Sequence, residues 1–429
     1  MKVELIKTTD PGFRKAFDRI LHRRGEIEER VEQAVAEIIR AVRKGGDSAI
    51  LRYTKRFDGV TLQRSAIEVT RREMDDALAS VPKPVLRSLR LAGRRIRKFH
   101  QRQLEKSWSY RDPLGLTLGQ RITPLERIGV YVPGGKAAYP STVLMAVTPA
   151  RVAGVKEIVV ASPIRQQAAL VLAAARIAGA DRVFRVGGAQ AIAALAYGTK
   201  VIPQVDKIVG PGNVYVAAAK RLVFGQVDID SIAGPSEVLL LVDQTANPRY
   251  VAADMLSQAE HDELAAAICV TSSLTVARKV QAELEKQLAS TRRHDITLGA
   301  LRRFGMIFVS RSLKESVEIT NAIAPEHVEV MVRQPQKCAE MVRNAGAIFV
   351  GPFAPPPLGD YVAGPNHVLP TGGSARFFSP LGTYDFLKRT SMIRAERRAL
   401  GALAPSIVQL ARLEGLDEHA RSVETRLAE

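Results

Sequence analysis

Four short segments in the second half of the sequence each combine a histidine with other acid–base or metal-binding side chains. They hold four of the seven histidines of the chain. A histidine beside carboxylates can bind a metal as neutral imidazole or move a proton near neutral pH. Because the segments are spread over separate elements, we expect the fold to gather them into one site. The segments are Gln258-Ala259-Glu260-His261-Asp262, Pro325-Glu326-His327, Gly359-Asp360 with Asn366-His367, and Asp417-Glu418-His419.

The first two segments suit metal binding and proton transfer, respectively. Gln258 and His261 lie three residues apart near an expected helix end, so both point to one face. A polar helix end exposed to water explains this spacing equally well. Glu326 and His327 lead into an expected strand, where neighbouring side chains point opposite ways. They could flank a substrate, one as base towards a hydroxyl and the other towards water. For this pair alone, solvated polar residues at a turn are the commoner case.

The remaining two segments add ligands of compatible chemistry. Asp360 lies in the Pro- and Gly-rich stretch Gly351–Gly373, after a strand end, where open α/β sheets usually contact ligands. His419 is far away on the C-terminal tail. Gln258, His261, Asp360 and His419 together form a nitrogen and oxygen ligand set, in which two histidines and one aspartate suit Zn²⁺ and a glutamine is unusual. Open coordination positions would favour a catalytic rather than a structural metal.

Three glycine-rich turns follow expected strands, and the last two of them precede helices. Backbone amides in such turns can hold phosphates. None matches the full G-x-G-x-x-G pattern of dinucleotide-binding folds. Tight turns without a ligand are an equally good interpretation of the spacing. The turns are Val132-Pro133-Gly134-Gly135, Val186-Gly187-Gly188-Ala189-Gln190 and Gly210-Pro211-Gly212-Asn213.

Apolar strands alternate with helices from residue 128 to 350, which predicts α/β architecture with two doubly wound, incomplete Rossmann-like parallel sheets. We expect one domain from residues 1–127 and 238–380, including N-terminal helices, and a second from 128–237. Residues 381–429 would form a helical C-terminal tail. The first 110 residues read as helical. The expected strands are Ile128–Val132, Glu157–Ala161, Arg182–Val186, Lys207–Val209, Val238–Val242, Ala267–Thr271, Met306–Ser310, Val328–Val332 and Ala347–Val350.

Composition narrows the classes of protein. The 429 residues are 46% hydrophobic and 25% charged, as in soluble globular proteins. Neither a signal peptide nor an apolar run of roughly 20 residues is present, so we expect a cytoplasmic protein without membrane contact. The net charge of +18 would attract polyanions, but basic residues are scattered and aromatics few, so nucleic-acid binding is disfavoured. Cys269, in an expected buried strand, and Cys338, in an expected helix, lack surroundings that would activate a thiol.

Taken together, the longer motifs resemble those of the histidinol dehydrogenase family, in order and over nearly the whole chain. The run Pro355-Pro356-Pro357 before Leu358-Gly359-Asp360 is unexpected for that family. The motifs are Tyr131-Val132-Pro133-Gly134-Gly135, Val186-Gly187-Gly188-Ala189-Gln190-Ala191, Gly210-Pro211-Gly212-Asn213, Ala233-Gly234-Pro235-Ser236-Glu237, Ser257-Gln258-Ala259-Glu260-His261-Asp262, Ala324-Pro325-Glu326-His327, Gly359-Asp360-Tyr361, Gly364-Pro365-Asn366-His367-Val368-Leu369-Pro370, and Glu414-Gly415-Leu416 with His419.

The resemblance implies a zinc- and NAD-dependent oxidation of L-histidinol to L-histidine through the aldehyde, the last steps of histidine biosynthesis. His327 would take the hydroxyl proton and Glu326 would activate water. This agrees with the residue chemistry, because aldehyde oxidation needs a thiol or activated water and neither cysteine is suitably placed. The resemblance implies one zinc ion per subunit, held by Gln258, His261, Asp360 and His419. Substrate contacts would be these four residues with Ser236, His327, His367 and Glu414. NAD contacts would be Tyr131, Gln190 and Asn213.

The resemblance also implies a homodimer with shared active sites, in which the tail crosses over so that Glu414 and His419 complete the neighbour's site. Two other functions stay open. A relative that oxidises a different polar alcohol, such as a sulfonated diol, would keep the zinc ligands, although the Glu414 carboxylate would repel a sulfonate. A basic binding protein with a structural metal would unfold when the metal is removed.

Overall fold

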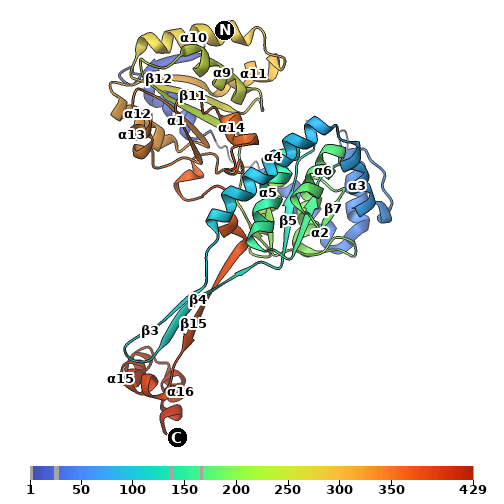
Figure 1. The fold of residues 1–429 in the computed structure, drawn as a ribbon, viewed down its shortest axis with the longest axis vertical. Helices are drawn as coiled ribbons and strands as arrows, with labels where there is room; N and C mark the ends of the chain where they lie inside the picture. The colour runs from blue at the N-terminus through green and yellow to red at the C-terminus, as the bar shows by residue number, and fades with distance from the viewer. Residues whose placement is uncertain (1–2, 24–28, 135–138, 165–167, 429) are drawn as a thin grey trace. The chain divides into compact units, whose positions relative to one another are not determined.

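The computed structural model describes residues 3–23, 29–134, 139–164 and 168–428 (Figure 1). The chain forms two compact units, each of which is described by itself. Unit 1 comprises Met1–Gln103 and Glu126–Phe386, and unit 2 comprises Leu104–Leu125 and Leu387–Glu429. No helix among the described residues combines the length and apolar character needed to cross a membrane.

The first sheet of unit 1 is fully parallel. Its central strands are buried along their whole length, as expected for a sheet covered by helices on both faces. One face packs against α9 (Pro248–Ala259), α10 (Leu274–Leu288) and α11 (His294–Phe304) (Figure 1). The other face packs against α1 (Phe13–Leu21), α12 (Leu313–Ile323) and α13 (Pro335–Met341). The strand order is β1 (Glu4–Lys7), β12 (Gly305–Val309), β11 (Ala266–Thr271), β10 (Glu237–Val242), β13 (His327–Met331) and β14 (Ala347–Val350).

The second sheet of unit 1 has the same kind of strand order: the second of its six strands along the chain, β5, lies between the third and the fifth, as β10 does in the first sheet. All its pairs are parallel except the antiparallel edge strand β2. Helices α2 (Glu29–Tyr53), α7 (Gly188–Tyr197) and α8 (Val214–Val223) share one core with it. Helices α5 (Pro140–Ala153) and α6 (Ala168–Ala178) pack with α3 (Arg71–Ser80) and α4 (Lys83–His100). The strand order is β2 (Glu68–Val69), β7 (Arg182–Phe184), β6 (Glu157–Ala161), β5 (Arg127–Tyr131), β8 (Lys207–Val209) and β9 (Asp228–Ile229).

The predicted fold class is confirmed, and all nine strands expected between residues 128 and 350 form with ends within two residues of the expectation. The N-terminal region differs from the expectation. Among the described N-terminal elements, β1 and α1 alone join the sheet of residues 238–350, whereas α2, α3 and α4 pack with the helices of the second sheet. The reason is long-range packing: Val35 and Ile39 of the α2 stripe meet Ile192 of α7 in one core. The strand β1 also corrects the expectation of an all-helical N-terminus.

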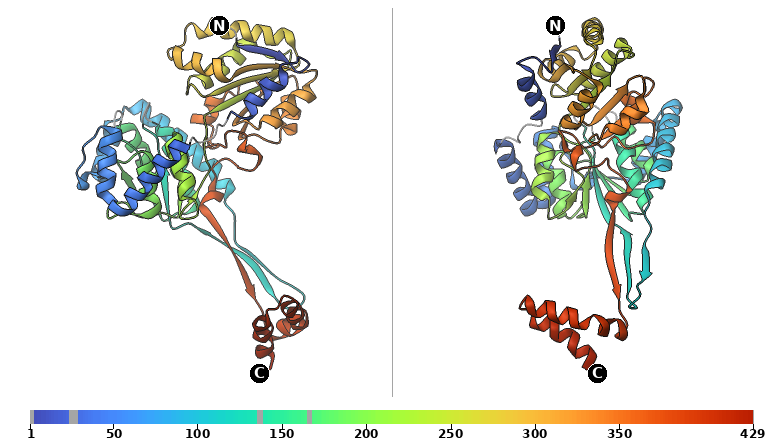
Figure 2. Two further views of the ribbon diagram at one scale, coloured as in Figure 1. Left: turned by 180° about the vertical axis from the view of Figure 1, so that it is seen from behind. Right: turned by 90° about the vertical axis from the view of Figure 1, so that its left-hand side faces the viewer.

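Unit 2 is a three-stranded antiparallel sheet followed by two helices (Figure 2). The order is β15 (Leu387–Arg394), β4 (Thr117–Pro124) and β3 (Trp108–Arg111), and α15 (Arg397–Leu413) packs with α16 (Asp417–Ala428). The expectation of a helical tail from residue 381 therefore holds only after β15. This strand is mostly exposed and lacks an apolar alternation, and pairing with the distant β4 defines it as a strand.

Candidate active site

The candidate catalytic residues lie at the amino end of β13, next to the amino end of β10. Helix α12 ends at Ala324, which adopts the left-handed conformation (φ 48°) and turns the chain into Pro325-Glu326. His327 is the first residue of β13 and lies opposite Val238 of β10. Asp360, which we expected at the carboxyl edge of a sheet, is brought back to this amino edge by the segment after β14. The short helix α14 (Pro356–Tyr361) carries it.

The proline run before Asp360 has a structural explanation. Pro355 occupies the N-cap of α14, and Pro356 and Pro357 follow in its first turn. These are the helix positions that tolerate proline, because their backbone N–H groups would have no partner within the helix. The prolines therefore start the helix whose last turn presents Asp360.

Glu326 and His327 are both buried and are held by the same neighbour. The backbone N–H of Glu237 donates to Glu326 Oε2 at 2.8 Å. His327 Nδ1 lies 2.8 Å from the backbone carbonyl oxygen of Glu237, so Nδ1 carries a proton and donates it there. His327 Nε2 lies 3.5 Å from Asp360 Oδ1. Glu326 Oε2 is 3.6 Å from His327 Nδ1, which places a carboxyl and an imidazole side by side.

The surroundings shift the pKa values of both groups. Burial raises the pKa of Glu326 to about 7, and the nearby carboxylates of Glu237 and Asp360 act in the same direction, against His327. Burial alone would lower the pKa of His327, but the negative charges of Glu326 and Asp360 outweigh it and raise the pKa to about 9. A carboxyl that titrates near neutrality beside a histidine can act as a general base.

Two more predicted residues, His261 and His367, lie around Asp360. His367 Nδ1 is 2.9 Å from the backbone oxygen of Asp360, and its Nε2 is 3.4 Å from Thr142 Oγ1 of α5. Burial lowers the pKa of His261 and of His367, which favours neutral imidazole. Burial would raise the pKa of Asp360, but His327, His367 and His261 together lower it. The structure thus gathers one carboxylate and three imidazoles at this edge.

Three of the four predicted metal ligands, Gln258, His261 and Asp360, belong to unit 1. No group of three or more His, Cys, Asp or Glu side chains among the described residues is arranged to hold a metal ion. Gln258 lies in the last turn of α9, is 2% exposed, and its Nε2 atom has no partner within the described structure. This nitrogen is a donor without an acceptor, whereas a cation would be held by the oxygen of the same amide. The donor types of Gln258, His261 and Asp360 therefore fit a divalent cation such as zinc, as an incomplete set.

Two predicted site residues, Glu414 and His419, belong to unit 2. Glu414 follows the last residue of α15 and His419 lies in the first turn of α16, and both are exposed. Ser236, by contrast, precedes β10 in unit 1, and its backbone oxygen accepts from the N–H of Ala266 at 3.0 Å. It is half-buried beside Glu237, at the same amino edge as Glu326 and His327.

The residues predicted to contact NAD lie at the carboxyl edge of the second sheet. Tyr131 ends β5, and its hydroxyl accepts from the N–H of Gly188, the first residue of α7, at 3.1 Å. Gln190 is 1% exposed, and neither of its side-chain polar atoms has a partner within the described part of the chain. Asn213 caps α8, where its Oδ1 accepts from the N–H groups of Tyr215 and Val216. Gly135 lies outside the described residues.

The glycine at the start of the last turn is required by the backbone. Gly210 has φ of 113°, and a Cβ atom there would lie 2.1 Å from the carbonyl oxygen of Tyr131. The Asp230 carboxylate accepts from the N–H of Gly210 at 2.7 Å. The buried Lys220 donates to the carbonyl oxygen of Gly210 at 3.0 Å and also forms an ion pair with Asp230. This turn is therefore held on both sides of the glycine.

Comparison with known proteins gives the family of the chain. A family model described as "Histidinol dehydrogenase" matches residues 21–427. The chain is 53% identical to the histidinol dehydrogenase of Aquifex aeolicus (strain VF5) over 427 residues, covering 99% of each chain. It is 52% identical to that of Syntrophotalea carbinolica, again with 99% of each chain covered. The chain belongs to the histidinol dehydrogenase family.

Fold comparison agrees with this assignment. The crystal structure of histidinol dehydrogenase from Elizabethkingia anophelis superposes with a TM-score of 0.93 at 32% identity, covering 99% of this chain and 98% of that one. The predicted membership of the histidinol dehydrogenase family is confirmed, and the chain is an oxidoreductase of histidine biosynthesis.

Two buried charged groups near the site, Glu237 and Arg23, were not among the residues predicted from the sequence. The available signal was a glutamate directly before the apolar strand Val238–Val242, because a carboxylate at a buried position needs a charged partner. Which cation supplies it could not be inferred, since Arg23 is 214 residues away.

Proposed function

We propose that this histidinol dehydrogenase oxidises L-histidinol to L-histidine through L-histidinaldehyde, using two NAD⁺ and one zinc ion per subunit. The observation that carries the proposal is the buried pair Glu326 and His327, with His261, Asp360 and His367 gathered around it. The first oxidation removes a hydroxyl proton and a hydride from the alcohol. The second adds water to the aldehyde and removes another hydride, giving the carboxylate and a second NADH.

His327 is the base proposed for the hydroxyl proton. Because its Nδ1 donates to the Glu237 carbonyl, Nε2 is the nitrogen that can accept a proton. The carboxylates of Glu326 and Asp360 favour the protonated ring. A cation held by Asp360 would oppose this charge and lower the pKa of His327 towards that of an effective base.

Glu326 is the base proposed for the water molecule. With a pKa near 7 it is partly ionised at neutral pH and can take a proton from water that attacks the aldehyde. A thiol route is disfavoured by both cysteines of the chain. Cys269 is fully buried in β11, where burial raises its pKa to about 12, and burial raises that of Cys338 to about 11. Water is therefore the nucleophile that this chain can activate.

Gln258, His261, Asp360 and His419 are the proposed zinc ligands. When bound, zinc supplies a positive charge that orients the substrate and stabilises developing negative charge. The buried amide of Gln258 and the neutral imidazole of His261 are suited to such a role. The proposed substrate contacts of unit 1 are Ser236, His327 and His367, together with the ligands Gln258, His261 and Asp360.

The proposed NAD contacts are Tyr131, Gln190 and Asn213. Helices α7 and α8 both begin at this edge, and helix N-termini favour phosphate groups. Burial raises the pKa of Tyr131 to about 12, so its phenol stays neutral and can hydrogen-bond. The unpartnered side chain of Gln190 is the second feature that supports a ligand here.

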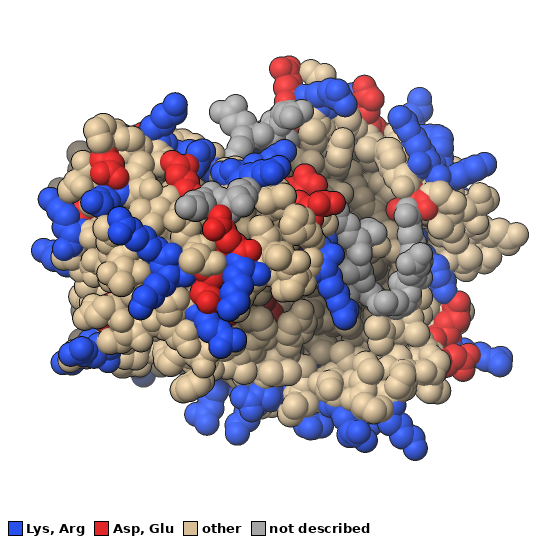
Figure 3. Space-filling view, turned by 90° about the horizontal axis from the view of Figure 1, so that it is seen from above, with Lys and Arg blue, Asp and Glu red and all other residues tan. Residues whose placement is uncertain are grey.

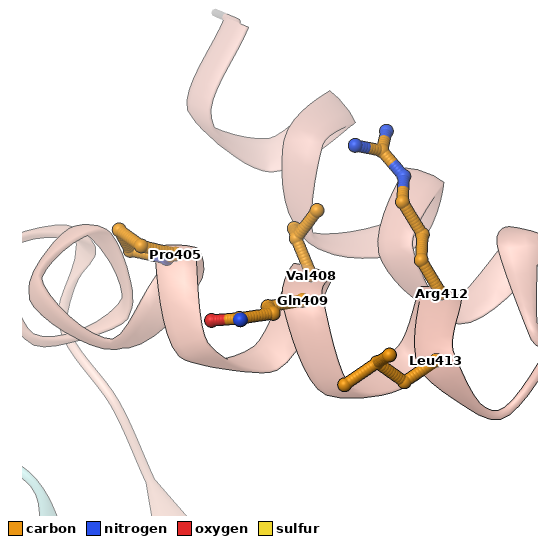
Figure 4. Close-up of a pocket in the computed structure, with 5 residues that line it drawn as sticks. All are labelled: Pro405, Val408, Gln409, Arg412 and Leu413. Atoms are coloured by element: carbon orange, nitrogen blue, oxygen red, sulfur yellow. The ribbon is translucent and has the colours of Figure 1, made fainter.

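We propose a homodimer in which the partner's unit 2 supplies Glu414 and His419. Unit 2 exposes apolar side chains that a lone copy would leave in water, including Leu413 at 76% and Ile393 at 77%. A shallow pocket on α15 adds to this surface (Figure 4), lined by Pro405, Val408, Gln409, Arg412 and Leu413. The Glu414 carboxylate would suit the ammonium group of histidinol, which disfavours a sulfonated substrate.

We propose a cytoplasmic enzyme that does not bind nucleic acid. On the face shown in Figure 3, the described Lys and Arg side chains are spread out with Asp and Glu among them, rather than gathered in one patch. On this face the charges do not form the basic stripe typical of nucleic-acid-binding proteins.

The test of the proposal is NADH formation with L-histidinol, with and without a chelator and added Zn²⁺. Zinc-restorable turnover that gives close to two NADH per histidinol is the expected result. A folded, zinc-loaded protein that does not turn over histidinol would contradict the proposal. A chelated protein that unfolds would indicate a structural metal instead.

A further inference from the structure

Glu237 contacts both proposed catalytic residues through its backbone and through its side chain. Its N–H donates to Glu326 Oε2 and its carbonyl accepts from His327 Nδ1, both at 2.8 Å. Its side-chain Oε2 accepts from the backbone N–H of Glu326 at 3.3 Å. The backbone bonds could form with other residues at this position, but the last bond requires the carboxylate.

The carboxylate of Glu237 is fully paired by groups from three distant segments. Arg23 donates from Nε to Oε1 at 2.7 Å and from a terminal nitrogen to Oε2 at 2.5 Å. The backbone N–H of Gly372 donates to Oε1 at 2.8 Å. The two side chains are only 4% and 3% exposed. An isolated charge at such a position would be strongly unfavourable, so the two residues act as one unit.

Arg23 is itself fixed in place. It follows α1, and it donates to the carbonyl of Ile20 at 2.7 Å and to that of Ile323, near the end of α12, at 3.4 Å. The pair thus joins the end of α1, the end of α12, the start of β13 and the turn at Gly372. All four lie at the edge of the sheet that carries Glu326 and His327.

We infer that Arg23 and Glu237 form a positioning pair: the Glu237 carboxylate holds the Glu326 backbone, and with it the Glu326 carboxylate, in place for the activation of water. Neither residue is assigned contact with the substrate. The inference rests on the proposed function, because the pair acts through the role assigned to Glu326.

The pair also affects the charge state of Glu326. The charged groups that face Glu326 are His327 and the carboxylates of Glu237 and Asp360, with Arg23 behind Glu237. Removing the negative charge of Glu237 leaves Arg23 uncompensated, so the anion of Glu326 is favoured and its pKa falls. Removing the positive charge of Arg23 has the opposite effect.

The first experiment compares Glu237→Gln with wild type in the full-length, zinc-loaded enzyme. The kcat values for L-histidinol and for L-histidinaldehyde are measured separately. Loss of positioning should lower kcat for the aldehyde by about 10- to 100-fold, the usual effect of removing a supporting hydrogen bond. The loss with histidinol should be smaller. The acid limb of the pH–rate profile for the aldehyde should move to lower pH.

Glu68→Gln is the matched control. Glu68 also forms a bidentate pair with an arginine, Arg182, at 2.8 and 2.7 Å, but it lies in the second sheet on the edge strand β2. This variant should keep the wild-type ratio of the two kcat values and the wild-type pH profile. The comparison separates the effect of losing an Arg–Glu pair in general from the effect of losing the Arg23–Glu237 pair.

Arg23 variants keep the test decisive if Glu237→Gln fails to fold. Arg23→Lys retains the charge but loses the bidentate geometry, so it should lie between wild type and Glu237→Gln in aldehyde turnover, with little change in the pH limb. Arg23→Met should move the limb to higher pH. A larger loss for the aldehyde than for histidinol in both Glu237→Gln and Arg23→Lys would support the inference, because a pair that only stabilises the fold would lower both kcat values alike. Opposite limb shifts in Glu237→Gln and Arg23→Met would show that the charges of the pair reach Glu326.

Equal losses in both oxidations, with an unchanged pH limb, would overturn the inference and leave a structural ion pair. Glu326→Gln, measured in parallel, separates this result from failure of the proposed function. If Glu326→Gln blocks aldehyde oxidation while the Arg23 and Glu237 variants keep the wild-type ratio, only the positioning role is refuted. If Glu326→Gln also leaves the ratio unchanged, the role of Glu326 and the present inference fail together.

Discussion

The two sheets of unit 1 have the same kind of strand order but carry their candidate sites at opposite edges. In the first sheet, Glu326, His327 and Glu237 lie at the amino ends of β13 and β10. In the second sheet, Tyr131 and the glycine turns lie at the carboxyl ends of β5, β7 and β8. The shared topology therefore does not determine which edge is used.

Helix polarity explains why the two edges suit different ligands. Helices α7 and α8 begin at the carboxyl edge of the second sheet, where their positive ends favour the phosphates of a dinucleotide. Helices α9 and α12 end at the amino edge of the first sheet, close to Gln258 and Glu326. Their negative ends favour cations, such as a metal ion or an imidazolium. The polarity of these helices is thus consistent with the proposal that one sheet binds the cofactor and the other binds the metal and carries the proton transfers.

The largest expected effect is at the amino edge. His327→Asn should lower kcat for both oxidations by about 10²- to 10⁴-fold, the usual contribution of a general base. Steady-state NADH formation with histidinol and with histidinaldehyde measures it, with zinc content as the control. A loss confined to one of the two oxidations would contradict a shared role for His327.

Glu326→Gln should separate the two oxidations. Its kcat for histidinaldehyde should fall by about 10²- to 10⁴-fold, because the amide cannot take a proton from water. The first oxidation should be much less affected, so aldehyde should accumulate or be trapped. Stopped-flow measurement of NADH should show a stoichiometry approaching one per histidinol. Small, equal losses in both oxidations would refute the assignment.

Gly210→Ala tests the carboxyl edge of the second sheet. The new Cβ would clash with the Tyr131 carbonyl and would require a left-handed conformation, a strain of order 1–3 kcal/mol. The KM for NAD⁺ should rise several-fold while zinc content stays unchanged. Gly225→Ala is a control, because it has a similar φ of 96° but open space around its Cβ position. A zinc defect in Gly210→Ala would show that the two edges are not functionally separate.

The smallest expected effect is on the pH dependence of the free energy of unfolding, through Glu329, a buried residue of β13 near the amino edge of the first sheet. Glu329 of β13 is 1% exposed, and burial, with the neighbouring Asp254 carboxyl, raises its pKa to about 10. Since this pKa is raised above the ordinary value near 4.5, the stability that Glu329 contributes is present at low pH and lost as pH rises towards 10.

The Glu329→Gln variant should not lose stability in this way as the pH rises, because its side chain does not ionise. Its Tm at pH 9 should exceed that of wild type by about 1 °C for each ~1 kcal/mol regained in a chain of this length, while at pH 5 the difference should be smaller or reversed. Thermal unfolding followed by circular dichroism at both pH values measures it. A pH-independent difference would show that Glu329 does not titrate in this range.

Local sequence patterns determined most of the secondary structure and the residues of the site. The buried strands from Ile128 to Val350 are short apolar runs separated by turns, and such runs have few other ways to be buried. The family motifs identified Glu326, His327 and Asp360, which the structure brings together. The glycine turn at Gly210 was visible in the sequence, although its close approach to Tyr131 was not.

Only the tertiary structure decided how these parts combine. It assigned α2, α3 and α4 to the second sheet, formed β15 by pairing with β4, and placed Asp360 at an amino edge instead of the expected carboxyl edge. It also paired Arg23 with Glu237 across 214 residues. Periodicity reports which face of an element is buried, but not against which partner. Partner choice depends on contacts between residues far apart in the chain, and those contacts exist only in the folded protein.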